Sequence, residues 1–397
     1  MRLLATMIAL AVAASPALAQ EPATREAEIA KTKTEKVGTL KPFEPGKVEK
    51  YPEKAEDLFL SGKLHWHPFF ESAYAGGGFT LGAGYMRHVS SYNTLDLRGS
   101  WTFSGYKRLE AAFLAPRVFN RRGVLSVVGG WREATSVGFY GIGSDATSKS
   151  DRTNYSFRQP YITGNLEVWP TRRYFLLGAG AEYSQWDQGP GEGRAPSVET
   201  VYTPATLPGL GEKIDYVHTR GLAGFDWRPA AGYARRGGAY TVELHDFADA
   251  DDAFGFRRVD YEAIQHLPVL RDAWVLSLHG RVETVHTKDG QQVPFFMLPA
   301  LGGGSSLRGF ASWRFRDQNS LLLQAEWRVL VNRFMDVGLF TDAGKVTARR
   351  EDLNFKDLKS DYGIGFRLHS PIATPLRIEL AKSNEGLVIV FSSKASF

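Results

Sequence analysis

Apolar and polar side chains alternate along most of the chain from Pro68 to Phe397. Leu95 and Leu97, for example, flank Asp96. Successive side chains of a β-strand point to opposite faces, so this two-residue period predicts strands with one apolar and one polar face. One face suits lipid and the other suits water, as in a strand of a membrane barrel. Soluble β-sandwich repeats are the alternative source of such a pattern.

About sixteen segments carry the alternation. The predicted strands are 68–76, 78–88, 92–104, 106–116, 122–133, 153–168, 173–187, 215–229, 238–247, 255–268, 273–286, 319–332, 335–346, 361–369, 375–383 and 386–393. An even number of strands is typical of bacterial outer-membrane barrels. The sequence therefore predicts an all-β fold, a transmembrane antiparallel β-barrel of about sixteen strands.

The connections between these strands differ in length in a regular way. The long connections, at 134–152, 188–214, 287–318 and 347–360, all follow odd-numbered strands, whereas the links around Thr171, Arg271, Arg333 and Ala373 are short. Short periplasmic turns and long outer loops are typical of outer-membrane barrels, and a sandwich gives no reason for the difference.

The N-terminal part of the chain differs in composition from the rest. Residues 1–19 have a positive start, an apolar run and an Ala-x-Ala end, which predicts a secretory signal peptide. Residues 20–63 are rich in Glu, Lys, Thr and Pro and lack the apolar content for a core, which predicts a disordered periplasmic tail. The barrel is expected to occupy residues 64–397. No later run is apolar enough for a transmembrane helix, so a role in the membrane would need a barrel.

The amino-acid composition fits a membrane barrel and argues against several other classes of protein and site. The chain has 25 Phe, 16 Tyr, 9 Trp and 41 Gly, as expected for strands that end in aromatic belts. It has no Cys, which removes disulfides and thiolate metal sites. The net charge of +5 is small for 397 residues and no basic block is present, so nucleic acid is not an expected partner.

The long connection before residue 319 carries the most unusual stretch. It contains three consecutive glycines followed shortly by one arginine and an aromatic residue: Gly302, Gly303, Gly304, Leu307, Arg308, Gly309 and Phe310. Glycines allow a sharply bent loop, and a permanent, fork-shaped cation favours carboxylates as partners. The next two strands place Glu326 and Asp342 on their polar faces, so a loop folded against that face would bring Arg308 between them.

These motifs resemble the BamA/TamA/two-partner-secretion (bacterial surface antigen) superfamily of outer-membrane β-barrels. The matching residues are Leu307, Arg308, Gly309 and Phe310 for a V/L-R-G-F/Y motif, and Phe340, Asp342 and Gly344 for an F-x-D-x-G motif. The resemblance implies that the eleventh connection returns into the lumen and that Arg308 pairs there with the second motif. Residues 139–145 resemble a recurrent family segment, and residues 386–391 with Phe391 and Phe397 resemble a terminal strand with a last aromatic.

The resemblance also implies a function. Such barrels assist the insertion or secretion of other proteins, so the expected partners are the outer-membrane lipid bilayer and unfolded outer-membrane or secreted client proteins, with a monomer in the bacterial outer membrane. POTRA domains usually precede the barrel, and residues 20–63 are too few to hold one. A passive pore or lipid-handling barrel, and an adhesive barrel that binds through residues 188–214, remain alternatives.

Other candidate sites have weaker support. Arg308, Glu326 and Asp342 could also simply brace the interior of the barrel, since pairing is how buried charges are tolerated. His65 and His67 share a strand face but have no evident third ligand, so we expect an aromatic cluster there and no metal site. No G-x-S-x-G motif or phosphate-binding loop is present, so neither an enzyme nor a cofactor is expected.

Overall fold

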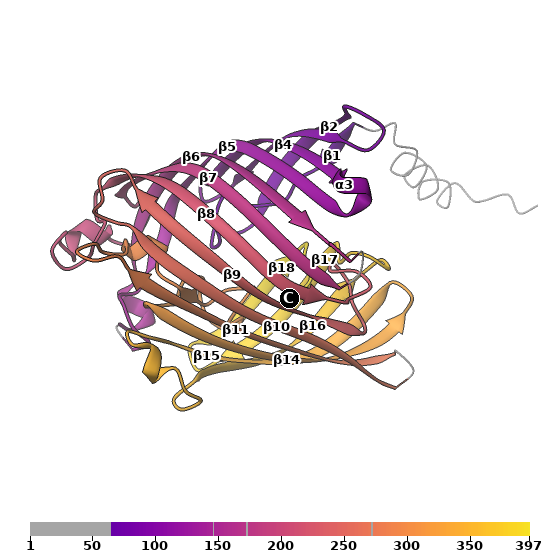
Figure 1. Cartoon of the computed structure of the whole chain (residues 1–397). Coiled ribbons are helices and arrows are strands. Elements are labelled where there is room, and N and C mark those ends of the chain that lie inside the picture. The colour runs from indigo at the N-terminus through magenta and orange to yellow at the C-terminus, as the bar shows by residue number, and fades with distance from the viewer. Residues whose placement is uncertain (1–64, 146, 172–173, 271–272) are drawn as a thin grey trace, which may run out of the picture. The chain divides into compact units, whose positions relative to one another are not determined.

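In the described part of the chain, an antiparallel sheet of sixteen strands makes up most of the fold, beside a small sheet of two strands. Figure 1 shows how the strands are arranged. The computed structural model describes residues 65–145, 147–171, 174–270 and 273–397. Residues 65–397 form one compact unit. The predicted signal peptide and the predicted tail lie outside the described residues. Among the described residues, no helix is long and apolar enough to cross a membrane.

The strands of the sheet follow one another in chain order, each paired with its neighbour. They are β1 (Trp66–Pro68), β2 (Thr80–His88), β3 (Thr94–Thr102), β4 (Lys107–Arg117), β5 (Gly123–Phe139), β6 (Thr153–Val168), β7 (Phe175–Pro190), β8 (Lys213–Asp226), β9 (Gly237–Asp249), β10 (Phe256–Leu270), β11 (Trp274–Thr287), β14 (Asn319–Asn332), β15 (Met335–Thr347), β16 (Lys359–Leu368), β17 (Leu376–Ser383) and β18 (Gly386–Ser392). The predicted all-β fold with sixteen sheet strands is confirmed.

Short elements lie in the connections. They are α3 (Val118–Arg121), η1 (Lys149–Asp151), η2 (Val198–Thr200), η3 (Phe295–Met297) and η4 (Arg350–Asp352), together with the paired strands β12 (Ala300–Leu301) and β13 (Phe315–Arg316). Because neighbouring strands are antiparallel, the long connections after β5, β7, β11 and β15 all lie at one end of the sheet, called here the loop end. The opposite end is called the turn end.

The prediction for the first strand is wrong. A strand was expected over 68–76, but β1 ends at Pro68. The chain then leaves the ladder and turns inward, because Phe69 and Ala73 are buried and the Glu71 carbonyl accepts a hydrogen bond from Ser100. β5 is longer than predicted, since it stays paired with β6 up to Phe139 across a register shift.

The two faces of the sheet differ as the alternation predicts. Large apolar side chains are exposed on the outer face, including Leu97, Trp101, Leu109, Ile162, Val242, Leu244, Leu278, Leu339, Ile364 and Ile389. Many polar or charged side chains point inward and are buried, including Glu110, Glu133, His245, Glu283, Glu326, Asp342 and Arg367. An apolar outer face and a polar inner face suit a barrel in a lipid bilayer.

The interior is not polar throughout, because an aromatic cluster fills it toward the loop end. Phe295 of η3 is fully buried there, and its ring centroid lies 5.1 Å from that of Phe139 and 4.9 Å from that of Tyr155. Trp186 and Phe296 belong to the same cluster. This packing closes that part of the interior with side chains.

We expect Phe295→Ala to lower the free energy of unfolding by about 3 to 5 kcal/mol, because it leaves a cavity in this cluster. The matched control is Phe355→Ala, whose side chain is 75% exposed and whose loss should change stability by less than about 0.5 kcal/mol. Urea unfolding of the protein folded in detergent micelles measures both. Equal unfolding midpoints for the two variants would contradict the packing.

Candidate functional site

The connection between β11 and β14 folds back into the interior as a bent loop. β12 and β13 pair at its base, and residues 302–314 between them are called here the Arg308 loop. Gly302 and Gly303 have φ angles of 115° and 95°, which other residues rarely adopt. A Cβ atom on Gly302 would also lie only 2.2 Å from the carbonyl oxygen of Ala311, so the loop can close this tightly only with glycine there.

Apolar side chains hold the loop against the inner wall. Leu307 and Phe310 are buried in a cluster with Phe315 of β13 and Leu322 of β14. The rings of Phe310 and Phe315 meet edge to face, with centroids 5.1 Å apart. This burial stabilises the inward position of the loop independently of its charges.

Arg308 is fully buried and binds three carboxylates. Its Nε and Nη2 donate to the two oxygens of Asp342 on β15, at 2.8 and 2.7 Å. Its Nη1 donates to Glu379 on β17 at 2.8 Å and to Glu326 on β14 at 3.2 Å. The guanidinium also lies over the ring of Phe340, 3.5 Å from its centroid. One cation on the loop thus joins β14, β15 and β17.

The charges around Arg308 keep it protonated. Burial by itself lowers the pKa of a guanidinium, but Asp342, Glu379 and Glu326 outweigh burial, so the pKa of Arg308 lies above its ordinary value. The three carboxylates need further cations, and Arg367 pairs with both Glu326 and Glu379. The site is a network of buried ion pairs.

Two glycines of the predicted motifs allow close contacts. A Cβ atom on Gly309 would lie 2.6 Å from the Cβ atom of Asp361 on β16. On Gly344 it would lie 2.7 Å from the carbonyl oxygen of Leu321 and 2.9 Å from Leu301 Cδ1. Both glycines therefore let the loop lie directly on the wall of the sheet.

Glu379 and Arg377 are members of the network that sequence reasoning missed. Arg377 lies 3.6 Å from Glu379 Oε2 and donates to the carbonyl oxygen of Gly304 at 2.9 Å. The available signal was the alternation of Leu376 to Ser383, which places both charged residues on the inner face of a short strand. Nothing local in the sequence shows that this strand lies beside the Arg308 loop.

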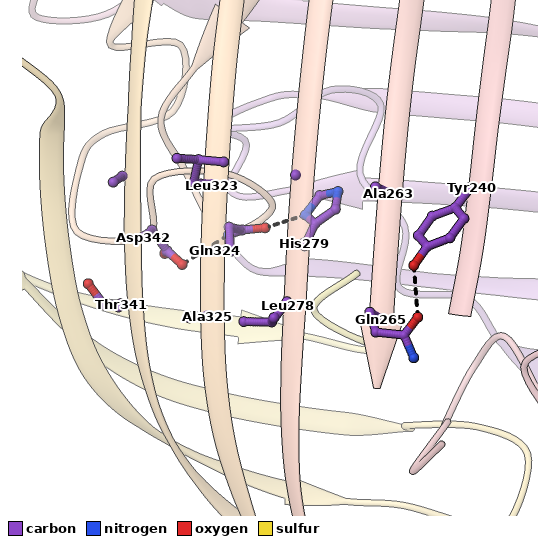
Figure 2. Close-up of a pocket in the computed structure, with 12 residues that line it drawn as sticks. Tyr240, Ala263, Gln265, Leu278, His279, Leu323, Gln324, Ala325, Thr341 and Asp342 are labelled. Atoms are coloured by element: carbon purple, nitrogen blue, oxygen red, sulfur yellow. Dashed lines mark hydrogen bonds between the residues drawn. The ribbon is translucent and has the colours of Figure 1, made fainter. Parts of the chain in front are cut away.

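Gln324 connects the network to a second polar group on the wall. Its side-chain amide donates to Asp342 Oδ1 at 3.0 Å and to the carbonyl oxygen of Ser306 at 2.7 Å. Its oxygen lies 2.7 Å from His279 Nδ1, as Figure 2 shows beside the hollow between β9 and β15. His279 in turn contacts Glu262 at 2.9 Å. The Arg308 loop is thus held by neutral hydrogen bonds as well as by ion pairs.

The two end strands of the sheet leave a seam. Among the described residues no ladder joins β1 to β18, and β1 has only three residues. β18 has seven residues, and on its outer face the ring of Phe391 is exposed. Lys394, just after β18, pairs with Glu71, just after β1, at 2.7 Å. Side chains therefore connect the two edges, which no backbone ladder joins in the described residues.

The Arg308 loop contacts both sides of this seam. The Trp313 indole donates to the carbonyl oxygen of Ala75 at 2.9 Å and stacks on Tyr74, with ring centroids 4.5 Å apart. On the other side, Arg314 pairs with Glu385, between β17 and β18, at 2.8 Å. One loop therefore contacts both the connection that follows β1 and the turn that precedes β18.

Residues 139–145 also contact the base of this loop. The Gly143 N–H donates to the carbonyl oxygen of Arg316 at 2.8 Å, and the Ser144 hydroxyl donates to that of Val346 at 2.9 Å. The predicted family segment is thus in contact with β13 and β15.

The prediction that Phe397 belongs to the terminal strand is wrong. β18 ends at Ser392, and the Phe397 ring instead lies inside the barrel, 4.9 Å from the ring of His279. The pairing of β17 with β18 ends at Ser392. The chain then turns inward, where the Ser396 hydroxyl donates to Glu326 at 3.0 Å.

The two N-terminal histidines make no metal site in the described residues. His67 Nε2 lies 2.9 Å from Asp96 Oδ1, and the His65 ring packs near Tyr85. No group of three or more His, Asp or Glu side chains in the described part of the chain is arranged to hold a metal ion.

Comparison with known proteins agrees with this architecture. Residues 235–386 match the model of the Omp85 superfamily domain. Three solved structures are similar: BamA from Haemophilus ducreyi lacking POTRA domains 1–3 (16% identity, TM-score 0.59, 82% of this chain and 67% of that one), CdiB from Escherichia coli (11%, 0.54, 82% and 61%) and CdiB from Acinetobacter baumannii (10%, 0.51, 79% and 56%). A search of curated proteins gave no match.

These comparisons support the fold of the chain, and they cover only part of the similar proteins. The chain spans 56% to 67% of the length of those three structures, and at such low identity they show the fold alone. The matched residues include the Arg308 loop and the strands β14, β15 and β17 that hold it. Residues 65–397 therefore have the fold of a sixteen-stranded β-barrel, and residues 235–386 within it match the Omp85 superfamily domain.

Proposed function

We propose that this chain assists the insertion of other proteins into the bacterial outer membrane or their secretion across it. The observation that carries the proposal is the position of the Arg308 loop, which is anchored to the inner wall and contacts both the connection that follows β1 and the turn that precedes β18. A loop in that place can couple the interior of the barrel to the pairing of its end strands.

The seam supplies a surface for an incoming chain. The outer edge of β18 has backbone N–H and C=O groups that no described strand pairs, and such an edge can accept a further strand by hydrogen bonding. β1 contributes only three residues, so little ladder would have to be broken. The expected partners are unfolded outer-membrane or secreted proteins, with the barrel acting as a monomer in the lipid bilayer.

A quantitative outer-membrane proteome tests the proposal. We expect a defined set of other barrels or secreted proteins to fall in cells lacking this chain, and the same set to fall in an Arg308→Ala strain that produces normal amounts of it. The matched control is Arg349→Ala, which removes an exposed arginine paired with Glu351 and Asp352 at the loop end. No change in any other protein in the deletion strain would contradict an assembly role.

A passive pore or lipid-handling barrel is the second candidate. It is favoured by the charged side chains along the inner face, among them Arg98, Glu110, Arg220, Glu243, Arg281 and Glu283. The aromatic cluster around Phe295 argues against an open path at the loop end. Steady solute flux through the intact barrel in vesicles, with an unchanged proteome in the deletion strain, would favour this second function.

A further inference from the structure

A basic cavity of about 410 Å³ lies at the turn end of the barrel, away from the Arg308 loop. It is bounded by the β8–β9 connection, residues 227–236, and by the turns that follow β14 and β16. Arg235, Arg236 and Arg333 line it, together with His369, and none of its described lining residues is a carboxylate. Because the described lining of this cavity contains cationic side chains and no carboxylate, the cavity favours an anion.

The walls of the cavity are fixed before any ligand arrives. The Tyr233 hydroxyl donates to Asp336 Oδ2 at 3.0 Å, and the Thr374 hydroxyl donates to the carbonyl oxygen of Gly232 at 2.9 Å. Arg328 donates to the carbonyl oxygen of Ala234. These three bonds hold residues 227–236 across the mouth of the barrel, so binding there need not pay for ordering a loop.

His369 gives a second, independent indication of a ligand. Its side chain is buried, with 6% of its surface exposed, and neither ring nitrogen has a hydrogen-bond partner among the described residues. The ring stacks on Tyr233, with centroids 3.8 Å apart. The backbone of His369 is also fixed, because its main-chain N–H donates to the carbonyl oxygen of Phe334 at 2.8 Å. Buried polar groups are rarely left unpaired, so an acceptor from outside the chain is expected at this imidazole.

The surroundings of the cavity indicate where the anion comes from. Leu330 and two prolines complete its lining, and Val331, Phe334 and Ile372 beside it expose more than half of their apolar side chains. Apolar side chains at the ends of membrane strands face lipid. Arginine forks bind phosphate oxygens through paired hydrogen bonds.

We propose that this cavity binds the phosphodiester headgroup of an anionic membrane phospholipid. Arg236 and Arg333 donate to the phosphate oxygens, His369 donates its ring N–H to the same group, and the acyl chains follow the apolar surface outside the cavity. The proposal is independent of any role in protein insertion, because it uses none of the Arg308 loop or the seam.

Isothermal titration calorimetry on the full chain in dodecyl maltoside tests the proposal. The probe is dihexanoylphosphatidylglycerol below its micelle concentration, with inorganic phosphate and uncharged dihexanoylglycerol as separate arms. We expect saturable binding of the phospholipid, and about tenfold weaker binding by an Arg236→Gln, Arg333→Gln double variant. His369→Phe, which keeps the ring stacked on Tyr233, should also weaken binding.

The matched control is Arg121→Gln, an exposed arginine on α3 at the same end of the barrel but outside the cavity, which should leave affinity unchanged. Heat-dependent gel mobility shows that each variant is folded. No saturable binding, or equal affinity of the wild type and the double variant, would overturn the proposal. Inorganic phosphate or dihexanoylglycerol binding as tightly as the phospholipid would overturn the assignment of a phospholipid headgroup.

Discussion

Replacing Arg308 by alanine is expected to lower the free energy of unfolding by about 3 to 5 kcal/mol, one of the two largest effects we predict. The substitution leaves Asp342, Glu379 and Glu326 buried on three strands without their shared cation. It also removes the contact with Phe340. The cost arises mainly from uncompensated buried charge, because a carboxylate taken out of water needs a partner.

Urea unfolding in detergent micelles measures this loss. Arg308→Lys is an informative second variant, because an ammonium keeps the charge but cannot make the two parallel bonds to Asp342, so its stability should fall between wild type and Arg308→Ala. Arg349→Ala, at an exposed ion pair, should have an effect below about 1 kcal/mol. An Arg308→Ala barrel as stable as the Arg349→Ala control would show that the network does not hold the loop.

Joining the Arg308 loop to β18 by a disulfide is expected to abolish assistance to client insertion. A Cβ atom on Gly304 would lie 3.9 Å from that of Val390, within the range of about 3.5–4.5 Å that disulfides require. The chain has no native cysteine, so a Gly304→Cys, Val390→Cys pair has no competing thiol. Under the proposed function, opening of the seam requires β18 to separate from the loop. The disulfide prevents that separation.

Reconstituted vesicles provide the measurement. Protease protection of a small client barrel should fall to background with the oxidised pair and recover when a reductant is added. Each single-cysteine variant should stay active under both conditions, which separates the disulfide from the substitutions. Full activity of the oxidised pair would mean that the loop and β18 act as one rigid unit, and the seam mechanism would be wrong.

Local sequence pattern was sufficient for the strands and for their faces. The alternation in residues 335–346 places Asp336, Phe340 and Asp342 on one side, and all three are buried on the inner face. The same reasoning placed Glu326 inward and made Arg308 its candidate partner. These properties depend on a two-residue period that neighbouring residues alone determine.

The alternation of apolar and polar residues did not predict where the chain leaves the antiparallel ladder. The apolar residues after Pro68 predicted a strand, but β1 ends at Pro68 and the chain turns inward. Carbonyl groups of this segment accept hydrogen bonds from the side chains of Ser100 and Trp313 instead of from a neighbouring strand. The ring of Phe397 likewise packs against the ring of His279 inside the barrel. In both cases tertiary contacts override the local preference.

The sequence by itself determined a sixteen-stranded barrel with an apolar outside and a glycine-rich loop that carries one arginine. Only the tertiary structure decided that Glu379 completes the pairing of Arg308, that Trp313 contacts the connection between β1 and β2, and that residues 227–236 cover a basic cavity. The physical reason is separation along the chain. Alternation fixes the face of each side chain, but which groups meet across the interior depends on how the whole sheet curves and staggers its strands.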